Sequence, residues 1–506
     1  MSNSSNTDGN ILNSSSFSTT ASSSNNDNKN WSLSNISTGL SNFVIQYNYG
    51  SMSCALLIMS ASVCTYNNDD IKLYSKCELM GEQKEWVEPT ANSIVYLGSI
   101  IGQLTLGFCG DYFGRTIALT IALFLTTIGA FFSAVAPPYN NDKAVSIYAV
   151  IIFFRFIMGI GVGAIFPLTA TKAAEDAGRE QTNGNPEKKL NLIAASWSYF
   201  WQMPGILAPW VLTFFLNLNK NSSASANWRC LLGFGAIPSG ICTIILLIEY
   251  FSSDNKSDKL LRETVSQNNT WGELKEYMSN RSSQYKLIGA SMPWFLFDFY
   301  IYGLGLVSGY ILISINGSTK DSNVSSAANL LLISYEEIIL LVSTIPGTIL
   351  SILYLIPKTG YKKGQFYSFI IHSIALAVIA MFFHVLSTKS SEGLFAFYAL
   401  MSCFLQIGVQ ITTFSIPSAS FPTNVRVTLN GLSCAIAKIG ALLGGSILYP
   451  IYLRSNWTTV LVLCSILAAI GAVVTHYFVD IEDIIVKEAP DNGKNNDKKE
   501  SELSRI

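Results

Sequence analysis

Three charged residues lie deep inside long apolar stretches of this 506-residue sequence: Arg155, Asp298 and Lys438. A charge within a membrane-spanning helix is costly unless it is paired or hydrated, so each is a candidate functional residue. If all three reach one central cavity, two cations and one acid give that cavity a net positive formal charge. Arginine offers a planar fork of donors that matches an oxyanion, and lysine adds a mobile point charge. These residue types favour binding of a small anion. The alternative is a buried salt bridge, such as Asp298 with Lys438, that only fixes helix packing.

The stretch PWFLFDFYIYG (293–303) places one of these acids among aromatic residues. Trp294, Asp298 and Tyr302 recur every four residues, so in a helix they share one face. An aromatic wall, a carboxylate and a hydroxyl on one face are suited to line the site of a polar substrate, whereas a Trp/Tyr stripe alone would indicate packing. Gln202 in WSYFWQMPGIL (197–207) adds an amide in apolar surroundings. That amide serves either the same site or a contact between helices.

The apolar stretches that carry these residues are long enough to cross a membrane. The chain is 49% hydrophobic and only 13% charged, which is far below the charged fraction of a soluble domain. An apolar helix of about 20 residues spans a bilayer. Twelve stretches reach that length, near 44–66, 91–109, 116–136, 146–168, 191–217, 229–250, 286–314, 330–356, 365–386, 393–418, 427–453 and 457–479. We predict an all-α membrane protein with twelve transmembrane helices in two six-helix bundles.

Polar segments divide the twelve predicted helices into two groups of six. A Ser/Asn/Thr-rich N-tail (1–42) is predicted to be disordered, and a C-tail occupies 480–506. The bundles are expected at 43–250 and 286–479, joined by a linker at 251–285. The tails and the loops on their side of the membrane hold 21 Lys and Arg residues, and the opposite loops hold nine. By the positive-inside rule both termini are cytoplasmic. No basic segment with a following apolar run is found at the N-terminus, so no cleaved signal peptide is expected.

Glycines and a charged turn connect the second and third predicted helices in GSIIGQLTLGFCGDYFGR (98–115), and a degenerate basic copy, PKTGYKKG (357–364), lies at the matching place in the second half. Small residues permit close helix approach, and Asp111 and Arg115 can pair in the turn. The pattern resembles the inter-helix signature of the major facilitator superfamily. That resemblance implies two bundles around a central site with rocking alternating access. The residues assigned to this gating signature are Gly102, Gly107, Asp111, Gly114, Arg115, Glu175 and Arg179.

Six stretches are similar to the phosphate:proton symporters of fungi and plants, a branch of that superfamily. They are GDYFGR (110–115), RFIMGIGVGAIFPL (155–168), YFWQMPGIL (199–207), WFLFDFYIYGL (294–304), FSIPSASFPTNVR (414–426) and GLSCAIAKIGALLG (431–444). The resemblance implies proton-driven uptake of inorganic phosphate across a plasma membrane. The positions that it assigns to phosphate binding are Arg155, Gln202, Trp294, Asp298, Tyr302 and Lys438. Asp298 is then the remaining core acid able to take up a coupling proton.

Two departures from the symporters remove acids. The helix-four motif of that family reads Gly-Gly-Asp-Tyr-Pro, and this chain has Ile165 in place of the Asp. The family also carries Asp residues in helix one, whereas YNYGSMSCALLIM (47–59) has none, with Asn48 and Ser51 near the expected places. The sequence therefore leaves the coupling to protons open.

Two other functions fit the same architecture. The first is a carrier of another solute, such as a sugar, an organic anion or a glycerophosphodiester. The second is a nutrient sensor that binds its ligand but barely transports it. An enzyme is not expected, because no nucleophile, metal cluster or phosphate-cradling loop is found. We expect no cofactor, no metal and no nucleic-acid partner, and the lipid bilayer is the surrounding medium.

Two covalent modifications are compatible with the predicted outer loops. Glycosylation sequons begin at Asn221, Asn316, Asn323 and Asn456. Cys64 and Cys77 flank the first loop and are candidates for a disulfide, while most of the nine cysteines fall within helices as small buried residues.

Overall fold

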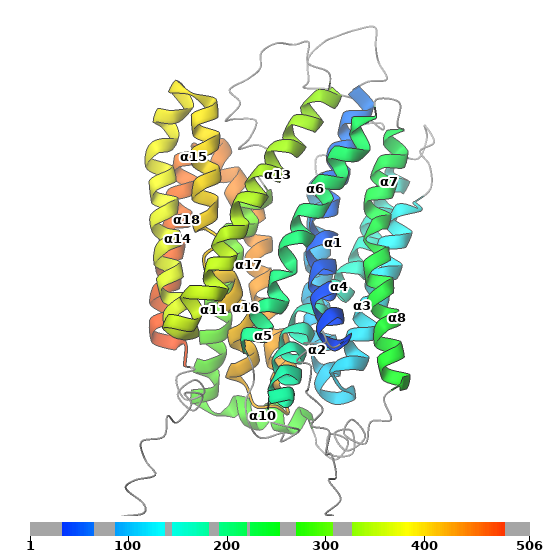
Figure 1. Cartoon of the computed structure of the whole chain (residues 1–506), viewed down its shortest axis with the longest axis vertical. Coiled ribbons are helices and arrows are strands. Elements are labelled where there is room, and N and C mark those ends of the chain that lie inside the picture. Colours follow the sequence, from blue (N-terminus) through cyan, green and yellow to red (C-terminus); the bar gives the residue numbers. More distant parts are fainter. Residues whose placement is uncertain are drawn as a thin grey trace, which may run out of the picture.

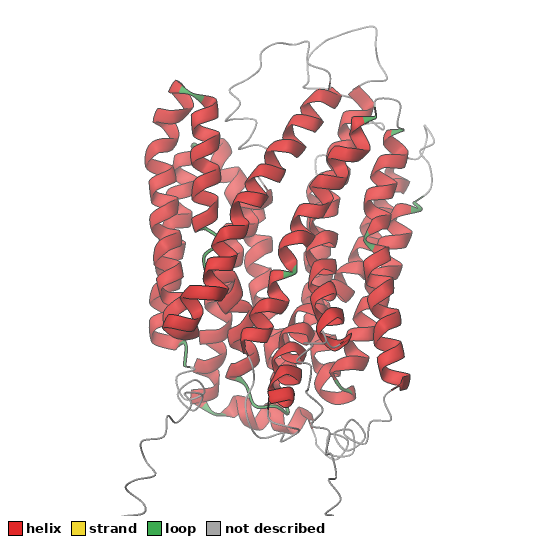
Figure 2. Ribbon diagram, viewed as in Figure 1, coloured by secondary structure: helices red, strands yellow, loops and turns green. Residues whose placement is uncertain are grey.

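The computed structural model describes residues 33–64, 87–136, 144–181, 192–219, 223–252, 270–306 and 326–480, and its regular elements there are all helices (Figure 1, Figure 2). The N-terminal half contains α1 (Leu33–Cys64), α2 (Val87–Phe113), α3 (Arg115–Ala134), α4 (Ala144–Gln181), α5 (Leu192–Phe200), α6 (Gln202–Leu218), α7 (Ala224–Phe234) and α8 (Ala236–Ser252). The short α10 (Thr270–Ser279) precedes the C-terminal half. That half contains α11 (Arg281–Leu306), α13 (Ser326–Leu350), the π-helical turn η1 (Ser351–Leu355), α14 (Ile356–Lys389), α15 (Ser391–Phe404), α16 (Val409–Ser420), α17 (Arg426–Arg454) and α18 (Trp457–Phe478).

The helices account for all twelve predicted membrane crossings. Nine stretches of the described residues are long and apolar enough to span a bilayer, and one of them, Leu330–Lys389, contains both α13 and α14. The remaining two crossings are α1, which is more polar, and the broken pair α5–α6. The prediction of an all-α, multi-pass membrane protein is confirmed.

Three crossings are broken into two helices, and prolines explain two of the breaks. A proline ring clashes with the carbonyl four residues earlier and provides no N–H. Pro204 stands four residues after Phe200, where α5 ends, and Pro238 stands four residues after Phe234, where α7 ends. The third break, between α15 and α16, ends at Gly408, whose φ of 74° suits a residue without a Cβ.

The helices pack within each half and meet across a central boundary. Within the N-terminal half α4 packs on α2 and α3, and within the C-terminal half α11 packs on α17 and α14 on α18. Contacts between the halves run mainly through α2 with α17 and α6 with α13. Gly102 lies against the backbone of Ile160 on α4, whereas Gly107 lies against Val427 and Gly431 of α17. The predicted glycine motif thus serves packing within one half and between the two halves.

The chain makes the same kind of turn at matching places of the two halves. Gly114 separates α2 from α3 with a φ of 99°, and Gly360 bends the chain after η1 with a φ of 75°. Both angles are in the range that favours glycine. We call the end of the molecule with the α2–α3 turn, at the bottom of Figure 1, the α2–α3 face.

Some element boundaries differ from the predicted ones. The first helix begins at Leu33, within the predicted tail 1–42, and α11 begins at Arg281, within the predicted linker 251–285. That linker also contains α10, which lies across the α2–α3 face in Figure 1 and packs Leu274 and Tyr277 against the ends of α11 and α17. Cys77 and the sequon asparagines 221, 316 and 323 lie outside the described residues. Asn456 is described, and its side chain accepts a hydrogen bond from the Thr459 N–H at the start of α18.

Candidate functional site

A cavity of about 290 Å³ lies between the two halves of the molecule. Its walls come from α1, α2, α4, α5 and α6 on one side and from α11, α13, α15, α16 and α17 on the other. This volume is close to the lower limit of ligand pockets, roughly 300 Å³, and suits a small solute. The predicted site residues that line it are Gln202, Trp294, Asp298, Tyr302 and Lys438.

The centre of the cavity is an ion pair between α17 and α11. Lys438 Nζ donates to Asp298 Oδ2 at 2.8 Å, and each residue is only 1% exposed. The helices come close enough because Gly440 and Gly444 lie directly against the backbone of α11. The predicted alternative, a salt bridge that fixes packing, is present as a contact, but its two partners also line the cavity. The pair is therefore positioned both to hold the helices and to meet a solute.

Aromatic rings surround the ammonium group of Lys438. Its Nζ lies 4.0 Å from the ring centroid of Tyr302, 4.9 Å from that of Phe166 and 5.5 Å from that of Tyr49. A cation above aromatic faces is stabilised electrostatically, by about 2 kcal/mol or more where water is excluded. These contacts keep the cation in the cavity without further carboxylates. The ammonium therefore keeps donor capacity for a solute.

A chain of amides connects α1, α6 and α11 along one wall. Gln46 donates to the side-chain oxygen of Gln202 at 2.7 Å, and Gln202 donates to Asn42 at 2.9 Å. Gln46 also reaches the hydroxyl of Tyr302 at 3.5 Å. Asn42 in turn donates to Ser198 Oγ at 2.7 Å. These amides order one another, so Gln202 is held at the cavity wall and also connects α6 to α1.

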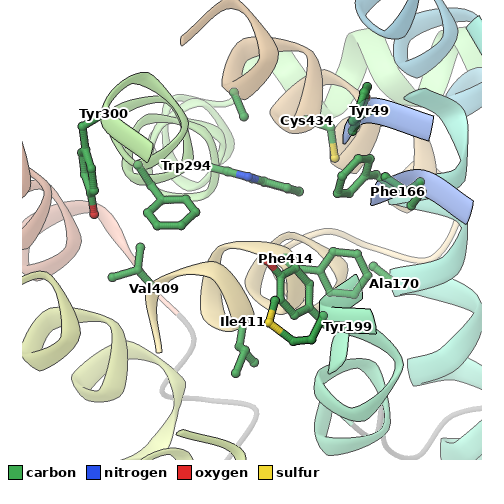
Figure 3. Packing of buried hydrophobic residues seen from close by; sticks show 14 of the residues in the cluster. Tyr49, Phe166, Ala170, Tyr199, Trp294, Tyr300, Val409, Ile411, Phe414 and Cys434 are labelled. Atoms are coloured by element: carbon green, nitrogen blue, oxygen red, sulfur yellow. The ribbon is translucent and has the colours of Figure 1, made fainter. Parts of the chain in front are cut away.

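Aromatic side chains close the cavity on the side of the α2–α3 face. In Figure 3 Trp294 points toward Phe166, and Phe414 lies beside Tyr199. The ring centroids are 6.3 Å apart for Phe166 and Trp294, 6.4 Å for Phe166 and Phe414, and 5.2 Å for Tyr199 and Phe414. These rings come from α4, α5, α11 and α16, so both halves contribute to this floor.

Arg155 does not line the cavity, contrary to our expectation. Its guanidinium is 1% exposed and turns toward α1, where it donates to the Asn48 carbonyl at 2.6 Å and to Ser51 Oγ at 2.9 Å. Arg155 forms no ion pair with a carboxylate in the described part of the chain. The physical reason is helix geometry, because Arg155 and Phe166 are eleven residues, about three turns, apart on α4, and α1 crosses next to Arg155. Asn48 and Ser51, near the expected places of the helix-one acids, contact this arginine.

The cavity carries a different charge from the one that the sequence suggested. With Arg155 outside, the charged residue types among its described lining residues are Lys438, Asp298 and Glu337. Two acids and one base make a net negative formal charge, where the sequence predicted a net positive one. Glu337 belongs to α13 and is 5% exposed. Ile165, at the position of the missing acid, is fully buried in the apolar core and is not among the lining residues.

Polar contacts join the two halves at the α2–α3 face. The carboxylate of Asp111 accepts hydrogen bonds from the backbone N–H of Val427 and Thr428, the first turn of α17, at 3.2 and 2.7 Å. This contact caps a helix of the other half and satisfies N–H groups that have no intrahelical partner. Arg115 donates to the Thr423 carbonyl at 2.9 Å. Asp111 and Arg115 also form the predicted pair, at 3.5 Å.

Glu175 adds a second connection at the same face. It lies 3.1 Å from Arg115 and 2.6 Å from Arg426, and thus bridges the two halves. Arg426 was not predicted as a site residue, although it ends the stretch FSIPSASFPTNVR (414–426) that is similar to the symporters. The side chain of Arg179 lies outside the described residues. These contacts and the aromatic floor separate the cavity from the α2–α3 face.

Several cavity residues were missed because their types are common in packed cores. Phe166 follows Ile165 directly in the helix-four motif. In helix one, Tyr49 lies between Asn48 and Ser51, and Gln46 lies two residues before Asn48. Helix one turns about 100° per residue, so a shift of one or two positions decides which side chain faces the cavity. The spacing of Gln46, Tyr49 and Ser53, three and four residues apart, was the signal available in the sequence.

Comparisons with known proteins agree with this architecture. A family model described as "Sugar (and other) transporter" matches residues 35–481, which is most of the chain. The inorganic phosphate transporter PT2 of Toxoplasma gondii is 30% identical over 438 residues, covering 87% of this chain and 70% of the relative. The repressible high-affinity phosphate permease of Neurospora crassa is 26% identical over 413 residues, covering 71% and 69%.

Among solved structures, the proton:xylose symporter XylE with a bound bromodeoxyglucose has a similar fold. Its TM-score is 0.64 at 16% identity, with 90% of this chain and 98% of that chain covered. A partially occluded inward-open form of XylE from E. coli has a TM-score of 0.61 at the same 16% identity. At this identity the likeness concerns the fold alone.

Proposed function

We propose that this chain, which belongs to the sugar (and other) transporter family of the major facilitator superfamily, carries inorganic phosphate across a membrane by alternating access. Members of this family are transporters of small molecules and not enzymes. The observation that carries the proposal is the Lys438–Asp298 pair, set in a small cavity between two helical bundles. The names of the phosphate-transporting relatives support the choice of anion.

In the proposed bound state phosphate oxygens accept hydrogen bonds from Lys438. The lysine provides charge, and the Tyr302 hydroxyl, the Trp294 indole N–H and the Gln202 amide provide directional donors. Arg155 has no place in this set, because its guanidinium is bound to α1. A single cation that is shared with Asp298 favours binding that is strong enough to select an anion and weak enough to release it.

Asp298 is the proposed proton-coupling group at the ion pair. An anion that approaches Lys438 competes with the Asp298 carboxylate 2.8 Å away. A proton on Asp298 removes that competition and the repulsion between the carboxylate and the anion. Proton and anion then favour each other's binding, which is the thermodynamic requirement for symport.

The proposed transport cycle separates the two halves at the α2–α3 face. Opening there would break the bridge of Glu175 to Arg426 and the capping of α17 by Asp111. We assign this face to the cytoplasm, with both termini cytoplasmic, on the charge distribution of the loops. The plasma membrane is the location that the resemblance to the phosphate:proton symporters implies. The division into bundles at 43–250 and 286–479 and the glycosylation of outer loops remain part of the same proposal.

A second candidate function is transport of a neutral sugar or polyol. The cavity has four glutamine amides, Gln46, Gln202, Gln406 and Gln410, and no net positive formal charge. Amides donate to and accept from hydroxyl groups equally well. The description of the family also names sugars.

Transport assays with purified protein in liposomes separate these candidates. Uptake of labelled phosphate is measured at pH 5.5 and 7.5, with unlabelled phosphate, sulfate, glycerophosphate or glucose as competitor. We expect saturable phosphate uptake that is faster at the lower pH and insensitive to glucose. Glucose uptake without phosphate uptake would replace the proposal by the second candidate. Specific phosphate binding without any exchange would indicate a sensor.

A further inference from the structure

We infer that His372, on α14, is a positioning residue of the cavity, which fixes α11 and the break between α15 and α16 relative to each other. The inference rests on the proposed function, because it concerns how the phosphate site keeps its geometry. His372 and its partner Tyr300 are fully buried and are not among the described residues that line the cavity. His372 therefore acts through other residues and not by contact with the solute.

The imidazole ring of His372 contacts two segments of the chain at once. Its Nδ1 lies 2.7 Å from the hydroxyl oxygen of Tyr300 on α11, and its Nε2 lies 3.1 Å from the carbonyl oxygen of Ile407. A carbonyl oxygen only accepts, so Nε2 carries the proton that is donated to Ile407, and in the neutral ring Nδ1 accepts from the Tyr300 hydroxyl. An ionisable residue type at this depth in a membrane helix is a candidate functional residue.

The contact with Tyr300 holds α11 from the side that faces away from the ion pair. Tyr300 follows Asp298 by two residues, and a helix turns by about 100° per residue, so the two side chains point to nearly opposite sides of α11. In Figure 3 Tyr300 and Trp294 leave α11 on different sides. A hydrogen bond to Tyr300 opposes rotation of α11 about its axis. Such a rotation would turn Asp298 away from Lys438.

A cavity residue also packs against this pair. Phe297 lines the cavity, and its ring centroid lies 6.1 Å from that of His372 and 5.6 Å from that of Tyr300. The histidine thus lies directly behind the α11 wall of the cavity.

The contact with Ile407 holds the break between α15 and α16. The segment 405–408 joins these helices, and Gln406 in it lines the cavity together with Gln410 on the first turn of α16. Gln410 donates to the backbone carbonyl and to the side-chain oxygen of Gln406, so the two amides are held together. Gly408 lies directly against α14 as well. The position of these amides therefore depends on the contact of the break with α14.

The two contacts of His372 lie within one half of the molecule. The helices α11, α14, α15 and α16 all belong to the C-terminal half, whereas the proposed cycle separates the halves at Glu175 and Asp111. Residues behind a binding site hold its members at the distances that the solute requires. Loss of the His372 contacts should therefore weaken solute binding and leave the opening of the α2–α3 face unchanged.

Three substitutions remove the contacts separately and together. Tyr300→Phe removes the hydroxyl, and His372→Gln keeps an N–H near the place of Nε2 but has no acceptor in the place of Nδ1. We expect each to raise the KM for phosphate by about threefold. His372→Leu removes both contacts and should raise it by about tenfold. The double variant of His372→Gln with Tyr300→Phe should match His372→Gln alone, because both changes break the same hydrogen bond.

Thr475 provides a matched control on the other side of α14. It is fully buried on α18, and its hydroxyl accepts a hydrogen bond from Gln365 of α14 at 3.2 Å. Neither residue is among the described residues that line the cavity. Thr475→Val, like Tyr300→Phe, removes a buried hydroxyl that is bound to α14. We expect this control to lose thermal stability with a KM within about twofold of the wild-type value.

The test measures initial rates of labelled phosphate uptake in liposomes over a range of phosphate concentrations, with thermal unfolding of each variant in detergent. A raised KM in His372→Leu and Tyr300→Phe, with a maximal rate per folded carrier within about twofold of the wild type, supports the inference. A lower stability with an unchanged KM in both variants overturns it, because His372 would then serve packing alone. An equally raised KM in Thr475→Val also overturns it.

The outcomes separate this inference from the proposed function. Uptake of glucose without phosphate by the wild type rejects phosphate transport, and the KM values for glucose then test His372 by the same comparison. Wild-type phosphate uptake with unchanged KM values in the variants rejects the role of His372 alone.

A second measurement needs only the wild type and Tyr300→Phe. The chain has three histidines, and His384 and His476 are exposed, so substitution of these two assigns the ring signals of ¹⁵N-histidine-labelled protein. We expect His372 to carry its proton on Nε2, with an Nδ1 resonance that shifts in Tyr300→Phe and on saturation with phosphate. A proton on Nδ1, or an Nδ1 resonance that either change leaves in place, overturns the inference.

Discussion

Arg155 and Lys438 are two buried cations in opposite halves of the molecule, and their surroundings differ completely. Each side chain is about 1% exposed. Arg155 binds neutral oxygens of α1, at Asn48 and Ser51, whereas Lys438 binds the carboxylate of Asp298 beneath aromatic rings. Only Lys438 lines the cavity. The burial of a charge in a membrane helix therefore does not identify a substrate site; the partners of that charge do.

The two sites also differ in what their partners allow. A guanidinium bound to a backbone carbonyl and a hydroxyl has partners that cannot be exchanged for a substrate without moving α1. An ammonium bound to a carboxylate can exchange that partner for another anion of the same charge. The first site holds two helices together, and the second can take part in a transport cycle. Four substitutions test this comparison.

The largest effect is expected from Lys438→Ala. This change removes the cation and leaves Asp298 buried without its partner, which costs about 3–5 kcal/mol in comparable buried pairs. Phosphate uptake should fall by a factor of about 100 or more. Lys438→Arg keeps the positive charge and should therefore retain part of the phosphate uptake. Wild-type uptake by Lys438→Ala at equal amounts in the membrane would contradict the role of this lysine.

Asp298→Asn should have a smaller effect of a different kind. It removes the group that competes with phosphate for Lys438, so phosphate should bind more tightly and leave more slowly. We expect a lower KM together with a maximal rate reduced by about tenfold, because stronger ground-state binding does not speed the cycle. Initial rates over a range of phosphate concentrations measure both values. A raised KM at an unchanged maximal rate would show that Asp298 contacts the substrate directly.

Arg155→Met should affect stability and leave substrate binding intact. Loss of the hydrogen bonds from the guanidinium to α1 should lower the free energy of unfolding by about 1–3 kcal/mol. The measurement is thermal unfolding in detergent, combined with the KM for phosphate of the folded protein. That KM should stay within about twofold of the wild-type value. A tenfold higher KM with normal stability would mean that Arg155 reaches the substrate during transport.

The smallest effect is expected from Ser51→Ala. It removes one hydrogen bond to Arg155 and should lower the free energy of unfolding by about 1 kcal/mol. In the double variant with Arg155→Met the two losses should not add, because they break the same interaction. The control on the same helix is Ser53→Ala. In the wild-type protein the Ser53 hydroxyl donates to the side chain of Asn92 and not to Arg155. Full additivity would show that Ser51 and Arg155 act independently.

Apolar runs predicted the helices because a membrane crossing is a local property of some twenty residues. The two proline-induced breaks, after Phe200 and Phe234, also follow from local sequence. The helical segment Thr270–Ser279 was not predicted, since it lies across the α2–α3 face and does not cross the membrane.

The candidate site was predicted in part. The four-residue spacing of Trp294, Asp298 and Tyr302 placed them on one face of a helix, and the structure has all three in the cavity wall. The positions of Arg155 and Glu337 were not predictable in the same way. Arg155 shares a helical face with Phe166 but lies about three turns away along α4, so the helix that crosses at that depth, α1, decides what its side chain meets. Glu336 and Glu337 are both buried, and the packing of α13 decides which of the two lines the cavity.

The sequence by itself determined the class of the protein, its membrane crossings and the presence of unusual charges within them. Those features depend on composition and short-range spacing. Only the tertiary structure decided that Lys438 and Asp298, 140 positions apart, meet in one cavity, that Arg155 turns to α1, and that Glu337 joins the cavity from α13. The physical reason is that a charge acts through its neighbours in space, and those neighbours are brought together by helix packing from both halves of the chain.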